Sequence, residues 1–102
     1  TDRSGVMASG LGTAVIDFGA VPATEASVEV TGQADITADC AIEAWVTARS
    51  TSDNDTTAHK QAALFLRFVC SEATEGTGFT ITAYCLIGFV TGTFLIDWTW
   101  SD

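Results

Sequence analysis

Two neighbouring segments near the C-terminus carry the strongest pattern in the chain, an alternation of large apolar residues with polar ones. In the first, Gly78 to Gly88, one face is formed by Phe79, Ile81, Ala83, Cys85 and Ile87. In the second, Thr91 to Trp100, one face is formed by Phe94, Ile96, Trp98 and Trp100. A period of two in β-branched and aromatic residues bounded by glycines predicts strands that each bury one face. The short connection between them predicts a hairpin or near-hairpin, on which the core is organised.

Four earlier segments show weaker strand patterns. They are Leu11 to Phe18 with its apolar set at even positions, Ala26 to Thr31, Cys40 to Arg49, and about Ala62 to Ser71. The last follows good helix formers, so a single helical turn before it is compatible with the sequence. Short strands at regular spacing predict an all-β fold, an antiparallel β-sandwich or small barrel of about six to eight strands.

The two ends of the chain suggest how the domain is bounded. The chain has 102 residues, which fits one domain that buries roughly two thirds of its unfolded surface. Thr1 to Gly10 is polar and glycine-rich and predicts a flexible N-terminal arm, leaving residues 11–102 as a single β domain. The hexamers at Gly12 to Asp17 and Gly92 to Asp97 resemble each other, which suggests equivalent edge positions for the two terminal strands.

Composition and charge exclude several classes of function. The chain is 47% hydrophobic and 17% charged, too apolar for a disordered protein. Its longest apolar run, Cys85 to Val90, is far below the ~18 residues that would cross a bilayer, and the N-terminus lacks the pattern of a signal peptide. The formal charge of −9 repels phosphate, so we expect neither direct nucleic-acid binding nor membrane insertion.

The three cysteines, Cys40, Cys70 and Cys85, are an odd number without CxxC spacing. Buried free thiols are the favoured interpretation, in keeping with assembly in a reducing cytosol. A Cys70–Cys85 bridge between neighbouring strands is the alternative.

Candidate catalytic and metal-binding residues have simpler structural explanations. His59 is the single histidine and follows a polar loop, Ser50 to Thr57, so an exposed loop position is favoured over a catalytic one. Asp53 and Asp55 lack the glycine and closing glutamate of a calcium loop, and a solvated turn is favoured over cation binding. Asp17 and Asp97 are expected to face solvent or accept backbone hydrogen bonds. We therefore expect no enzyme, no metal and no cofactor.

The aromatic residues separate into core and candidate contact positions. Trp98 and Trp100 share a face with Phe94 and Ile96, so core packing is favoured over stacking on sugars. Trp45 lies on the charged face of its segment, where either a second layer covers it or it marks an exposed contact; the covered position is favoured. Together with Tyr84, it is the candidate exposed aromatic for glycan recognition.

Five stretches taken together resemble a group of small, mostly uncharacterised proteins of tailed bacteriophages and prophages. These stretches are Ile16 to Pro22, Glu25 to Gln33, Ile42 to Trp45, Gly76 to Ile81 and Gly92 to Trp100. The likeness covers most of the chain from Leu11 onward and implies a phage context. No catalytic residues come with it.

That context implies a structural protein of the virion, assembled in the bacterial cytoplasm. We expect a capsid decoration or cement protein that binds the major capsid protein or other virion proteins by shape, arm insertion and strand addition, as a homo-oligomer such as a trimer. The candidate contact residues are Thr1, Asp2, Arg3, Ser4, Val6, Met7, Trp45 and Tyr84. The alternative is a tail or fibre module that recognises a host-surface glycan.

Overall fold

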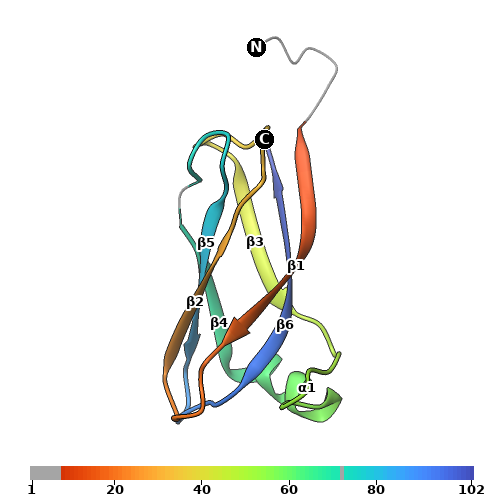
Figure 1. Cartoon of the computed structure of the whole chain (residues 1–102), viewed down its shortest axis with the longest axis vertical. Helices are drawn as coiled ribbons and strands as arrows, with labels where there is room; N and C mark the ends of the chain where they lie inside the picture. The colour runs from red at the N-terminus through yellow and green to blue at the C-terminus, as the bar shows by residue number, and fades with distance from the viewer. Residues whose placement is uncertain (1–7, 72) are drawn as a thin grey trace.

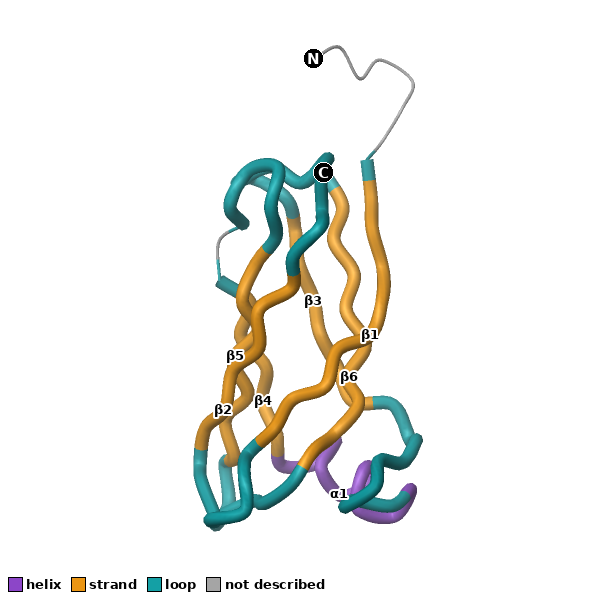
Figure 2. Tube along the Cα trace, viewed as in Figure 1, coloured by secondary structure: helices purple, strands orange, loops and turns teal. Residues whose placement is uncertain are grey.

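The computed structural model describes residues 8–71 and 73–102, which are mostly β-structure (Figure 1). The elements are β1 (Ser9–Asp17), β2 (Glu25–Val30), β3 (Ala41–Val46), α1 (Thr56–Phe65), β4 (Leu66–Cys70), β5 (Phe79–Cys85) and β6 (Thr93–Ser101). They form two antiparallel three-stranded sheets, with strand orders β1-β6-β3 and β2-β5-β4. The described strands thus form two separate sheets in a sandwich-like arrangement and not a closed barrel (Figure 2). In the described residues, no helix is long and apolar enough to span a bilayer.

The predicted C-terminal hairpin is wrong, because β5 and β6 belong to different sheets. Each is the central strand of its own sheet, and the connection between them passes from one sheet to the other, with Gly88 and Gly92 at positive φ. The alternation shows that each strand has one apolar face but does not specify which strands pair. When β5 and β6 are the central strands of two facing sheets, the apolar face of each is buried against the other sheet. The prediction that the core is organised on these two segments is confirmed.

The described strands fold back on one another, the first on the last and the second on the next to last. β1 pairs with β6, β2 pairs with β5, and β3 lies against β4, with α1 in the connection at the fold-back point. The edge strands β1 and β2 also contact each other between the sheets. The equivalent edge positions expected for the terminal strands are therefore wrong, because β1 is an edge strand and β6 is a central one.

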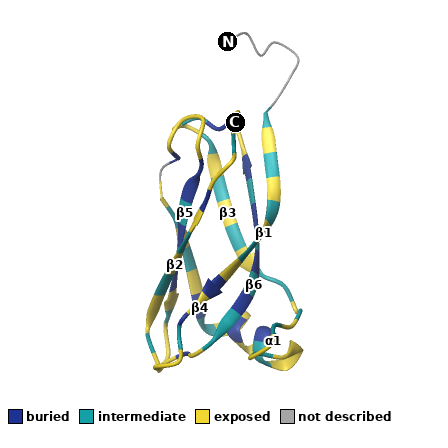
Figure 3. Cartoon of the chain, in the orientation of Figure 1, coloured by how far each residue is buried: buried dark blue, intermediate teal, exposed yellow. Residues whose placement is uncertain are grey.

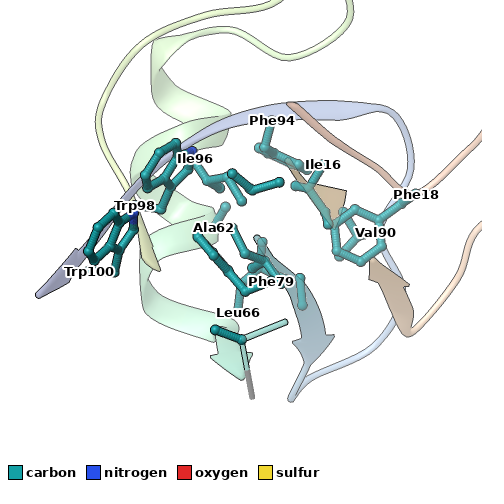
Figure 4. Close-up of a cluster of buried hydrophobic side chains, with 14 of the residues drawn as sticks. Ile16, Phe18, Ala62, Leu66, Phe79, Val90, Phe94, Ile96, Trp98 and Trp100 are labelled. Carbon is teal, nitrogen blue, oxygen red and sulfur yellow. The ribbon is translucent and has the colours of Figure 1, made fainter. Parts of the chain in front are cut away.

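The core lies between the sheets and follows the predicted alternation (Figures 3 and 4). Even positions of β1 and β6 and odd positions of β5 face inward, and Ile16, Ile81 and Ile96 are fully buried. Trp98 and Trp100 are buried as predicted. The ring of Trp98 packs edge-on against Phe79 of the opposite sheet, with centroids 5.4 Å apart. Hydrophobic burial between the two sheets is thus the main stabilising term of the fold.

The start of β1 corrects the predicted arm. The predicted arm includes Ser9 and Gly10, which is wrong, because these residues pair with Ser101 and Trp100 in the β1–β6 ladder. A Cβ at Gly10 would overlap the indole of Trp100, and a Cβ at Gly12 would lie 2.6 Å from the Trp98 ring. The glycines therefore belong to the strand, because they leave room for indoles from β6. The remaining arm residues named as contacts, Thr1 to Ser4, Val6 and Met7, lie outside the described residues.

The segment predicted as a strand from Ala62 to Ser71 begins as a helix. α1 continues to Phe65, and β4 occupies only Leu66–Cys70. Asp55 caps the helix by accepting a hydrogen bond from the Ala58 backbone N–H at 2.8 Å, and His59 and Ala62, one turn apart, are its buried residues. The alanine-rich start favours a helix of several turns, whereas the sequence analysis allowed a single turn.

Candidate functional site

The polar loop before α1 completes the edge of β6 where β3 ends. β3 pairs with β6 only as far as Val46 and Ile96. Beyond that point, the Asp53 carboxylate accepts a hydrogen bond from the Thr93 backbone N–H. Thr51 Oγ1 and Asn54 Nδ2 both donate to the Thr93 carbonyl, each at 2.9 Å. Side chains of this loop thus replace a neighbouring strand along β6, which protects an otherwise open sheet edge.

His59 belongs to the same system, so its expected exposed position is wrong. The side chain is 0% exposed. Its Nε2 accepts a hydrogen bond from the Leu95 backbone N–H at 3.0 Å, and its Nδ1 lies 2.9 Å from the Asp55 carbonyl oxygen. Because one ring nitrogen accepts, the other carries the proton and donates to the carbonyl. Both nitrogens bond to backbone, so the imidazole ties α1 to β6 and is not placed as a catalytic base.

Asp53 and Asp55 are engaged by the protein itself. Hydrogen bonds from the side chains of Thr93 and Thr51 lower the pKa of Asp53 below its ordinary value, and Asp55 caps α1. Among the described residues, no group of three or more histidine, cysteine or acidic side chains could hold a metal ion. The turn predicted at this loop is present, and its two carboxylates serve the fold.

The Asp53 contacts predict an acid-sensitive contribution to stability. A lowered folded-state pKa means that the carboxylate stabilises the fold above its unfolded pKa and stops doing so as the pH falls through the folded value. We expect Asp53→Asn to lower stability at pH 7 and to reduce the loss of stability below about pH 4. Urea unfolding at several pH values measures this. Asp39→Asn, at an exposed acidic residue outside the loop, is the control, and identical pH profiles for Asp53→Asn and wild type would contradict it.

All three cysteines are free and each is partly buried. The favoured interpretation of free thiols is confirmed, although none is fully buried. Cys70 is the ladder partner of Ile81, and Cys85 is the partner of Leu66, so the two sulfurs are not opposite each other. Burial, with the nearby charge of Glu43, raises the pKa of the Cys70 thiol. This thiol therefore stays protonated, and less reactive, at neutral pH.

The two candidate exposed aromatics lie on opposite faces of the molecule. Trp45 lies on the outer face of the β1-β6-β3 sheet, and Tyr84 lies on the outer face of the β2-β5-β4 sheet. Trp45 is 44% exposed, so the favoured covered position is wrong, and a role for Trp45 as a contact stays a prediction. Tyr84 is 39% exposed. The pair does not form one groove.

Asp97 is held by side chains and not by backbone. Arg49 forms an ion pair with one carboxylate oxygen, and Thr47 Oγ1 donates to the other. Burial raises the pKa of Asp97, but the hydrogen bonds from Arg49 and Thr47 and the positive charge of Arg49 outweigh it, so the net pKa is lowered. The prediction for Asp17 is confirmed, since its carboxylate accepts a hydrogen bond from the Gly19 backbone N–H.

One end of the molecule exposes a group of large apolar residues that the sequence analysis did not single out. We call this group the apolar end and define it as Val21, Leu64, Leu86, Ile87 and Phe89, all largely exposed. The apolar residues on both sides of Gly88 were a sequence signal for the apolar end. They were not recognised as an exposed group because the alternation pattern placed them in a predicted strand and hairpin.

Backbone hydrogen bonds bring the segments of the apolar end together. The Val90 N–H donates to the Ala23 carbonyl, and the Leu86 N–H donates to the Phe65 carbonyl, both at 2.9 Å. The connections β1–β2 and β5–β6 therefore meet beside the end of α1. This end lies opposite the start of β1 and the end of β6 (Figures 1 and 3).

No protein-family model, curated protein or solved structure matches the chain.

Proposed function

We propose that this chain is a structural protein of a bacteriophage virion, a decoration or cement protein that attaches to the head shell through the apolar end. The observation that carries the proposal is the exposure of five large apolar side chains at one end of a small acidic domain. Ile87 is 77% exposed and Phe89 is 71% exposed. Large exposed apolar side chains gathered at one end of a domain favour an interface.

The energetics suit attachment in many copies. Full burial of one such side chain is worth about 1.5–3 kcal/mol, and association itself costs several kcal/mol in lost freedom. One copy therefore binds modestly, while many copies on a lattice together favour the assembled shell, because a ligand that binds only the lattice stabilises it. Residues 1–7 of the arm predicted at Thr1 to Gly10 lie outside the described residues, and they stay a second expected contact of the proposal.

The strand order adds a fold-level argument. The first strand pairs with the last and the second pairs with the next to last, an order that resembles a jelly roll with fewer strands. Jelly rolls form viral capsid and lectin domains, among others. This fold-level analogy agrees with the phage context that the sequence resemblance implies.

The location in the particle is the first test. Virions are purified from the host that carries this gene, labelled with an antibody against the protein, and imaged by electron microscopy. We expect label over the head. Label confined to the tail would replace the decoration function with the tail or fibre module, and virions without label would contradict any role in the particle.

The second test examines the apolar end. We expect the double variant Ile87→Ser with Phe89→Ser to bind shells at least about tenfold more weakly, since about 1.4 kcal/mol of lost burial corresponds to a factor of ten. Cosedimentation with shells stripped of the protein measures this. Leu11→Ser removes an equally exposed apolar side chain, 83% exposed, from the face of β1. Equal weakening by Leu11→Ser would show that the effect does not come from the apolar end.

A further inference from the structure

The outer face of the β1-β6-β3 sheet places an exposed tryptophan beside a fixed polar cluster. Asp97 of β6 is the ladder partner of Trp45 on β3 and of Thr13 on β1. Paired residues in a sheet project to the same side, so the three side chains form one row across this face. We call this row, together with Arg49 and Thr47, the Trp45 row.

The polar groups of this row are already oriented. Arg49 and Thr47 donate to the two oxygens of Asp97, and the side chains of Arg49 and Asp97 are 36% and 17% exposed. Each carboxylate oxygen has a second lone pair, and a guanidinium has five N–H donors, so both groups retain hydrogen-bonding capacity. Holding them in place beforehand lowers the entropy cost of binding a ligand.

We propose that the Trp45 row binds a neutral saccharide. A sugar ring has an apolar C–H face that suits the exposed indole of Trp45, and it has hydroxyl groups that both donate and accept, which suits Asp97, Arg49 and Thr13. Arg49 neutralises the charge of Asp97, so the row itself attracts neither anions nor cations strongly. The net charge of −9 disfavours acidic saccharides. This site is independent of the attachment surface and does not rest on the proposed role in the virion.

Nuclear magnetic resonance of the indole N–H groups tests the proposal on the whole chain. The chain has three tryptophans, of which Trp98 and Trp100 are buried and Trp45 is exposed. The probes are maltohexaose, cellohexaose, mannohexaose and chitohexaose, with an oligogalacturonate as the acidic comparison. We expect at least one neutral probe to shift the Trp45 indole signal in a saturable way, with a Kd of about 1 mM or below, while the other two indole signals stay in place.

Matched variants assign the effect to the row. Trp45→Ala should abolish binding while the signals of Trp98 and Trp100 show that the fold is intact, and Asp97→Asn should weaken binding about tenfold. Tyr84→Ala, which removes a similarly exposed aromatic from the opposite sheet, should bind as wild type does.

Three results would overturn the proposal. The first is a Trp45 signal that no neutral probe shifts, and the second is a shift with the acidic oligosaccharide alone. The third is a Trp45 signal that changes with protein concentration and not with saccharide, which would assign this face to contact with a second copy of the chain.

Discussion

Replacing Gly78 with alanine is expected to lower the free energy of unfolding by more than about 3 kcal/mol, a large part of a total that is typically 5–15 kcal/mol. Gly78 precedes β5, and its backbone runs against the end of β2. A Cβ there would overlap the carbonyl oxygen of Val30 and lie 2.7 Å from its carbonyl carbon and 3.0 Å from the Thr31 Cα. These are backbone atoms, so no side-chain rotation relieves the overlap.

The surroundings of Gly78 also prevent the turn from moving away. The Thr74 N–H donates to the Gly78 carbonyl at 2.8 Å. Two more backbone bonds hold the turn against the segment after β2: the Gln33 N–H donates to the Thr77 carbonyl, and the Gly76 N–H donates to the Ile36 carbonyl. Relief of the overlap would break several of these bonds, and each acceptor left unpaired in a buried residue, here Gly78 or Ile36, costs about 1–3 kcal/mol.

Urea unfolding followed by tryptophan fluorescence measures the loss. Gly88→Ala is the matched control, because Gly88 has φ +75° but no atom within 4 Å of a new Cβ. It should lose only about 1–2 kcal/mol, the cost of a left-handed conformation. If Gly78→Ala were no less stable than Gly88→Ala, the close approach of β2 to Gly78 would be wrong.

The second large effect is expected from His59→Ala, which should lower the free energy of unfolding by about 3 kcal/mol. The change opens a cavity beside Phe94, whose ring centroid lies 5.1 Å from that of His59. It also leaves the Leu95 N–H without its acceptor at a position beyond the end of β3. The free-energy cost of the cavity adds to the cost of the unpaired N–H group, because side chains that move into the cavity supply no hydrogen-bond acceptor.

Two measurements distinguish the loss of the His59 hydrogen bonds from the effect of removing any side chain from α1. Lys60→Ala, at the exposed neighbour on α1, should stay within about 0.5 kcal/mol of wild type. Hydrogen exchange at the Leu95 amide should be accelerated in His59→Ala more than exchange at Ile81, in the other sheet. Unchanged protection of the Leu95 amide would contradict the bridge between α1 and β6.

Local pattern predicted the strands of this protein, whereas pairing depended on the whole chain. The alternation at Phe94 to Trp100 is a property of neighbouring residues and indicated correctly which side chains are buried. The two partners of β6 are β1, near the opposite end of the described chain, and β3, and nothing local to β6 specifies either of them. The resemblance of the terminal hexamers was misleading for the same reason, since similar residues occupy an edge strand and a central one.

The errors at the candidate sites have physical causes of the same kind. His59 follows a polar loop, and the sequence does not show that an unpaired backbone N–H of β6 lies within reach of its ring. Asp55 followed by helix formers was the available signal for a helix N-terminus there. Exposure of Trp45 depends on whether another part of the chain covers its sheet, which only the assembled fold decides.

The pairing of the first strand with the last has a consequence for how the protein is made. Ser9 pairs with Ser101 and Asp17 with Thr93, so the β1–β6 ladder joins residues separated by almost the entire chain. Contacts of such long separation slow folding, because the entropy of closing the loop is lost before the contacts form. On the ribosome, β6, the central strand of the β1-β6-β3 sheet, is synthesised after the other five described strands. The nascent chain therefore cannot complete this core until β6 has been synthesised, and until then its exposed apolar segments are prone to aggregation.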